Sequence, residues 1–122
     1  MRRLLAIDDN EDILKLIEAA AKKAGFVTRT LSSSLEFQEA FRDFEPDAIV
    51  LDVLMPRMDG IEIIQWLLEQ GFTGRVIVMS GNADYIRMAV HIGSATDRLA
   101  VVALEKPFRA TDLRNALEAG GS

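Results

Sequence analysis

Residues 47–60 read DAIVLDVLMPRMDG, and this stretch decides the fold class. Its first half is a short run of aliphatic and β-branched residues, typical of a strand buried on both faces of a parallel sheet. The run stops at a carboxylate, Asp52. A lone aspartate at a strand end is more often a helix cap or a solvated loop residue. The meaning of Asp52 therefore depends on the other apolar runs of the chain.

Apolar runs alternate with amphipathic segments along the whole chain. Besides the opening stretch, strands are expected over residues 4–7, 26–31, 76–79 and 99–104. Helices are expected over residues 13–24, 35–44, 61–68, 83–92 and 110–119, where apolar residues recur at helical spacing. Residues 26–31 alternate apolar and polar side chains, which suits an edge strand. Five strand–helix pairs predict an α/β domain over residues 1–119, with a parallel sheet between two layers of helices, and a tail or linker over residues 120–122.

Composition limits the function classes. The 122 residues suffice for one domain, and 49% hydrophobic with 27% charged residues describes an ordinary globular protein. No apolar run approaches the roughly 20 residues of a membrane span, and the start lacks a signal-peptide layout, so a cytoplasmic protein is expected. The chain has no cysteine and one histidine, which argues against disulfides and zinc sites. A net charge of −5 argues against binding to nucleic acid or to an anionic membrane.

Polar side chains follow four of the five expected strands. Asp8 and Asp9 end the first strand, Asp52 the third and Ser80 the fourth, and Lys106 follows the fifth. Because ligands of open α/β sheets bind beyond the carboxyl ends of the strands, these side chains are expected to share one rim. Each residue also has an ordinary interpretation. Asp8, Asp9 and Asn10 could together cap the first helix, and Ser80 could be another helix cap. Lys106 could be a surface lysine.

Three carboxylates at one rim need a counter-charge. Each like pair about 4 Å apart costs roughly 4 kcal/mol at the effective dielectric near a protein surface. A hard divalent cation with oxygen ligands, Mg²⁺, would offset this repulsion. Lys106 and the Ser80 hydroxyl are suited to contact the oxygens of a transferring phosphoryl group, and the remaining carboxylate could be the nucleophile that forms an acyl phosphate.

Taken together, these motifs resemble the receiver domain of two-component response regulators. The residues that carry the resemblance are Asp8-Asp9, Asp52, Met55-Pro56, Met58-Asp59-Gly60, Ser80 and Lys106-Pro107-Phe108. The resemblance implies a CheY-like, flavodoxin-like (βα)5 three-layer sandwich with strand order 2-1-3-4-5. It also implies that Asp52 accepts a phosphoryl group from a sensor histidine kinase or a histidine phosphotransfer protein.

The resemblance assigns the other residues as well. Asp9, Asp52 and the backbone carbonyl of Leu54 would ligate Mg²⁺ directly, and Asp8 would act mainly through water. Lys106 would contact the phosphoryl group, Ser80 would be the switch hydroxyl, and the Lys106–Pro107 peptide would be cis. The domain would be a signalling phosphoacceptor rather than an enzyme, and it would control a C-terminal output domain or a partner protein.

One departure from the family pattern bears on switching, and two alternative functions are considered. Many receivers carry Tyr or Phe three residues before the lysine, where this chain has Ala103, so coupling between that aromatic and the switch hydroxyl is not expected. A receiver-like interaction module that works without phosphorylation is the main alternative. A haloacid-dehalogenase-like phosphatase also uses a strand-end Asp and Mg²⁺, but Leu54 stands where its second Asp would be.

Overall fold

The computed structural model describes residues 2–52, 60–94 and 99–118. Within them the chain forms one five-stranded parallel sheet in the order β2-β1-β3-β4-β5, as expected. The strands are β1 (Arg2–Ile7), β2 (Phe26–Leu31), β3 (Ala48–Asp52), β4 (Arg75–Ser80) and β5 (Ala100–Glu105). The α-helices are α1 (Glu11–Lys23), α2 (Phe37–Phe44), α3 (Gly60–Glu69), α4 (Ala83–Ser94) and α5 (Ala110–Glu118).

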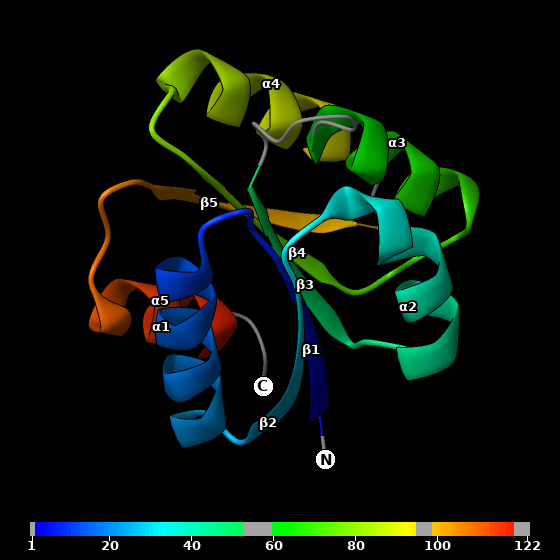
Figure 1. The fold of residues 1–122 in the computed structure, drawn as a ribbon. Coiled ribbons are helices and arrows are strands. Elements are labelled where there is room, and N and C mark those ends of the chain that lie inside the picture. Colours follow the sequence, from blue (N-terminus) through cyan, green and yellow to red (C-terminus); the bar gives the residue numbers. More distant parts are fainter. Residues whose placement is uncertain (1, 53–59, 95–98, 119–122) are drawn as a thin grey trace.

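The helices form a layer on each face of the sheet (Figure 1). One apolar core lies between the sheet and α1 and α5, and the other between the sheet and α2, α3 and α4. Every residue of β3 is buried, because helices cover both of its faces. The predicted three-layer sandwich is therefore confirmed, and β2 and β5 are its two edge strands.

Most predicted elements are confirmed, with shifted ends. β1 begins at Arg2 because Arg2 and Arg3 pair with the first residues of β2, and the Asp47 carboxylate also accepts from the Arg3 N–H at 2.8 Å. The second helix, predicted over residues 35–44, begins later than expected. Ser33 caps a short 3-10 turn, Ser34–Glu36, and α2 follows from Phe37 without a side-chain cap. The expected tail, residues 120–122, lies outside the described residues.

Gly74 offers the sharpest test of packing at the opposite end of the sheet from the strand-end carboxylates. A Cβ on Gly74 would lie 2.3 Å from the Asp47 carbonyl oxygen and 2.4 Å from the Phe72 ring. A backbone carbonyl cannot rotate away as a side chain can, so Gly74→Ala is expected to lower the free energy of unfolding by about 2 kcal/mol. Urea titration measures this change. The control is Gly81→Ala, whose Cβ would meet no atom within 4 Å. Equal stability of the two variants would contradict the prediction.

Candidate functional site

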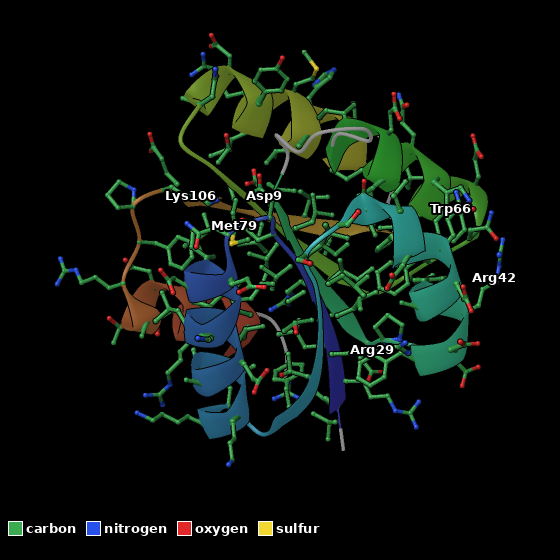
Figure 2. The ribbon with its side chains drawn as sticks, viewed as in Figure 1. Asp9, Arg29, Arg42, Trp66, Met79 and Lys106 are labelled. Atoms are coloured by element: carbon green, nitrogen blue, oxygen red, sulfur yellow. The ribbon has the colours of Figure 1, made fainter. Side chains whose placement is uncertain are left out.

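The strand ends bring the expected polar residues to one rim of the sheet. Asp8 and Asp9 follow β1, Asp52 and Ser80 are the last residues of β3 and β4, and Lys106 follows β5. Figure 2 shows Asp9 and Lys106 at this end of the molecule, with Arg42 and Trp66 at the side formed by α2 and α3. Parallel strands explain the arrangement, because all their carboxyl ends point the same way.

Three carboxylates converge at this rim. One oxygen each of Asp8, Asp9 and Asp52 lies within 4.8 Å of the others. Asp8 is fully buried and Asp52 is 6% exposed, whereas Asp9 lies on the surface. The Lys106 Nζ donates to Asp8 at 2.9 Å and to Asp52 at 3.0 Å. The ordinary interpretation of Lys106 as a solvated surface lysine is thus wrong for this chain.

Burial and the neighbouring charges shift the pKa values of Asp8 and Lys106. Burial raises the pKa of Asp8 above its ordinary value, and the nearby charge of Asp52 adds to the increase, although the Asn10 N–H and Lys106 oppose it. Burial alone would lower the pKa of Lys106, but its hydrogen bonds to Asp8 and Asp52 and their charges raise it overall. Lys106 is therefore protonated at neutral pH, and its single positive charge lies beside a cluster of three carboxyl groups.

Two asparagines link the ends of the site strands to the helices that follow; from the sequence, Asn10 was considered as part of a helix cap, but the cap made by Asn82 was not predicted. Asn10 caps α1, because its Oδ1 accepts from the N–H groups of Asp12 and Ile13. Its own N–H donates to Asp8 at 2.9 Å. The helix cap considered for Asp8, Asp9 and Asn10 together is thus made by Asn10, while Asp8 and Asp9 belong to the carboxylate cluster. An Asn two residues after a strand-end Asp, followed by acidic residues, was the signal available.

The same arrangement recurs after β4. The Asn82 N–H donates to the Ser80 Oγ at 2.9 Å, and the Asn82 Oδ1 accepts from the N–H groups of Asp84 and Tyr85. Ser80 is only 1% exposed, and its carbonyl accepts from the Lys106 N–H at 2.8 Å. The helix cap is therefore Asn82 rather than Ser80. The Lys106–Pro107 peptide is cis, as expected.

The residues of the cluster fit a magnesium ion. Carboxylate oxygens are the ligands that this hard cation prefers, and three are close enough to share one ion. Asp8 and Asp52 are buried and share one lysine, Lys106. A divalent cation would therefore reduce the electrostatic repulsion among the three carboxylates. The expected Leu54 ligand and the motif residues 53–59 lie outside the described residues.

The fold and the cluster together define a flavodoxin-like α/β domain with an acidic, lysine-containing site at the carboxyl edge of its sheet. The family model for the response regulator receiver domain matches residues 4–118. The chain therefore belongs to the response regulator receiver domain family. Members of this family are signalling phosphoacceptors of two-component systems, and the complete acidic set does not favour the alternative of a module that works without phosphorylation.

Individual relatives agree with this assignment. The transcriptional regulatory protein GltR of Pseudomonas aeruginosa is 26% identical over 97% of this chain and 48% of its own length. Sporulation initiation phosphotransferase F of Bacillus subtilis is 29% identical over 95% of this chain and 90% of its own. The chain thus spans about half the length of GltR and most of the phosphotransferase.

Solved structures give the same result. The receiver domain of NtrX from Brucella abortus is similar with a TM-score of 0.80 and 28% identity, over 95% of this chain and 98% of its own. The beryllofluoride-activated NtrC4 receiver domain dimer is similar with a TM-score of 0.80 and 29% identity, over 98% of this chain and 96% of its own. Across the described residues, no helix has the length and apolar character needed to cross a membrane.

Proposed function

We propose that Asp52 of this domain accepts a phosphoryl group from a histidine kinase or a histidine phosphotransfer protein in a Mg²⁺-dependent reaction. The loaded domain then changes conformation and controls an output domain or a partner protein. The observation that carries the proposal is the convergence of Asp8, Asp9 and Asp52 with Lys106. The proposal of an output domain rests on relatives such as GltR, of which this chain matches about half.

The reaction that we propose is a transfer between two nucleophiles. A carboxylate oxygen of Asp52 forms a bond to phosphorus, while the bond from phosphorus to the imidazole nitrogen of the donor breaks. Lys106 already contacts Asp52 at 3.0 Å, so its ammonium group is placed to attract the oxygens of the incoming phosphoryl group. The Ser80 hydroxyl, at the end of the neighbouring strand, is the proposed second donor to those oxygens.

The metal site is part of the same proposal. Asp9 and Asp52 would hold Mg²⁺ directly, together with the Leu54 carbonyl, and Asp8 would act mainly through water. When bound, the ion supplies positive charge that neutralises the phosphoryl oxygens. Asp9 is the exposed member of the cluster, so a cation can reach its carboxylate directly from solvent.

Intact mass spectrometry tests the proposed function. The purified domain is incubated with acetyl phosphate, in one sample with Mg²⁺ and in another with excess EDTA. We expect the mass of one phosphoryl group to be gained only in the Mg²⁺ sample, and peptide mapping to place it on Asp52. No gain in mass, or an equal gain in both samples, would contradict the proposal.

Magnesium should also stabilise the folded domain before any phosphoryl donor is added. A ligand that binds only the folded state at 100 times its dissociation constant adds about 2.7 kcal/mol to the free energy of unfolding. We therefore expect the thermal midpoint to rise with Mg²⁺ concentration, and EDTA to reverse the rise. The control is Asp9→Asn at matched ionic strength, which should show a smaller rise. The same rise in both proteins would place the ion elsewhere.

A further inference from the structure

A cavity of about 490 Å³ lies at the opposite end of the sheet from the carboxylate cluster. It is formed by the connection from α2 to β3 and by the connection from α3 to β4, so it lies at the amino ends of these two neighbouring strands. Its volume falls in the range of pockets that hold small organic molecules. The proposed phosphoryl transfer uses none of the residues that line this cavity, so its role has to be sought separately.

Aromatic rings form one wall of the cavity. Phe41 from α2 and Phe72 from the α3–β4 connection line it, and their ring centroids lie 5.5 Å apart in an edge-on arrangement. Phe41 also packs edge-on against Trp66, at 5.2 Å. Figure 2 shows Trp66 beside Arg42, whose guanidinium lies over the Trp66 ring at 5.7 Å from its centroid. Because the face of an aromatic ring attracts positive charge, this group of rings already accommodates one cation.

The charges around the cavity favour a second cation. Of the described residues that line it, Arg42 carries a positive charge, and Glu45 and Asp47 carry negative charges. Two helices, α2 and α3, also end at the cavity, where Glu45 and Gly71 line it. The carboxyl end of a helix carries a partial negative charge, so both helices add to the negative potential. A positively charged ligand would therefore be attracted to this cavity.

The backbone of Glu45 is an independent indication of a binding site. Glu45 ends α2 in the left-handed region, with φ 50° and ψ 63°, and it is the one non-glycine residue with positive φ in the described part of the chain. Glycine takes this position in many helices, as Gly71 does after α3 with φ 75°. The Glu45 side chain is 80% exposed, and its carboxylate lies 4.0 Å from the Arg3 Nη1, which makes a weak ion pair. Strained non-glycine residues cluster at ligand sites, where the side chain has a use that glycine cannot supply.

We propose that this cavity binds an organic ammonium ion with an apolar body. The rings of Phe41 and Phe72 contact the apolar body, and the carboxylates of Glu45 and Asp47 attract the ammonium group. One oxygen of Asp47 accepts from the Arg3 N–H at 2.8 Å, but a carboxylate has acceptor sites for further donors. The inference does not rest on the proposed function, because no member of the carboxylate cluster lines the cavity.

The experiment is a ¹H–¹⁵N NMR titration of the domain with 2-phenylethylamine, which is protonated at neutral pH. We expect the signals of Gly71, Thr73 and Gly74 to shift and to saturate, and those of Asp9 and Ser80 to stay in place. The alcohol 2-phenylethanol, which has a similar shape without the charge, should bind roughly tenfold more weakly, because a hydrogen bond between charged groups is stronger. The anion 3-phenylpropionate should bind more weakly still.

Two variants of Glu45 separate binding from stability. Glu45→Gln keeps the size of the side chain without its charge, and it should weaken binding of the amine roughly tenfold. Glu45→Gly should weaken binding by the same factor, yet its urea midpoint should equal or exceed that of the wild type, because glycine adopts positive φ without strain. The control is Glu39→Gln, which makes the same charge change in the first turn of α2 and should bind like the wild type.

Four results would overturn the inference. They are no saturable response to the amine, equal affinity for the amine and the alcohol, tighter binding of 3-phenylpropionate than of the amine, and unchanged amine binding in both Glu45 variants. Shifts at Asp9 and Ser80 in place of Gly71 and Thr73 would also overturn it, because the amine would then lie at the carboxylate cluster. Phosphoryl loading without amine binding would contradict this inference alone, and amine binding without loading would contradict only the proposed function.

Discussion

Asp52→Asn is expected to abolish phosphoryl loading by acetyl phosphate and Mg²⁺. The amide has nearly the shape of the carboxylate and keeps one oxygen that can accept from the Lys106 Nζ, which lies 3.0 Å from Asp52. It lacks the negative charge and the basic oxygen that must form the new bond to phosphorus. The loss should therefore be complete rather than partial, and intact mass spectrometry of the treated protein measures it.

The matched control for this variant is Asp43→Asn. Asp43 is an exposed aspartate on α2, and its replacement makes the same change of net charge. Asp43→Asn should load like the wild type. If Asp52→Asn still gained one phosphoryl group while retaining a cooperative unfolding transition, the acceptor would be another residue and the assignment of Asp52 would be wrong.

Lys106→Met is expected to have the second largest effect, on stability and on loading together. The substitution keeps a long apolar side chain but removes the cation that bonds to both Asp8 and Asp52. Removing one partner of a buried ion pair is strongly destabilising, and about 3 kcal/mol of unfolding free energy should be lost at neutral pH without metal. Loading should be slowed by roughly 10²-fold or more, because one donor to the phosphoryl oxygens is missing.

The pH dependence of the Lys106→Met variant has a definite sign. The pKa of Asp8 is already raised in the folded protein, mainly by burial, and loss of Lys106 removes two of the contributions that lower it. A carboxyl group whose folded pKa exceeds its unfolded value destabilises the fold once it is ionised. The deficit of the variant should thus be largest at neutral pH and shrink as the pH falls through the raised pKa.

Urea titrations of the wild type and Lys106→Met across acidic to neutral pH measure this trend. Lys23→Met, at the exposed end of α1, is the control and should change stability little at any pH. Added Mg²⁺ should restore part of the stability of Lys106→Met, because it supplies positive charge to the same carboxylates. A deficit that grows on acidification would contradict this account.

The sequence predicted the architecture because its apolar runs match the strands closely. Residues 76–79 and 99–104, for example, became β4 (Arg75–Ser80) and β5 (Ala100–Glu105). The ends of the strands were harder to predict where they are polar. β1 begins at Arg2 rather than at residue 4, because Arg2 and Arg3 join the strand through backbone hydrogen bonds, which a hydrophobic pattern does not reveal. The start of the second helix was predicted too early for a related reason: residues 34–36 form a 3-10 turn, and the apolar pattern does not distinguish this turn from the α-helix that follows.

The candidate site was predictable as a set of residues but not as a network. Asp8, Asp9, Asp52, Ser80 and Lys106 were expected to share a rim because parallel strands end together, and the structure brings them there. Which partner each side chain takes depends on turn geometry. The bonds from the Asn10 and Asn82 N–H groups to Asp8 and Ser80 require a specific turn after each strand, and composition carries little information about it.

The two edge strands differ in how well they resist pairing with other chains. β2 carries an exposed charge within the strand, Arg29 (Figure 2), which discourages a foreign strand from adding to that edge. β5 (Ala100–Glu105) carries its one charge, Glu105, at its last residue, so the stretch before it brings no charge to that edge, where Ala100 and Ala103 are exposed. Aggregation of partly unfolded chains should therefore begin at β5, and a lysine at position 103 should delay precipitation on heating.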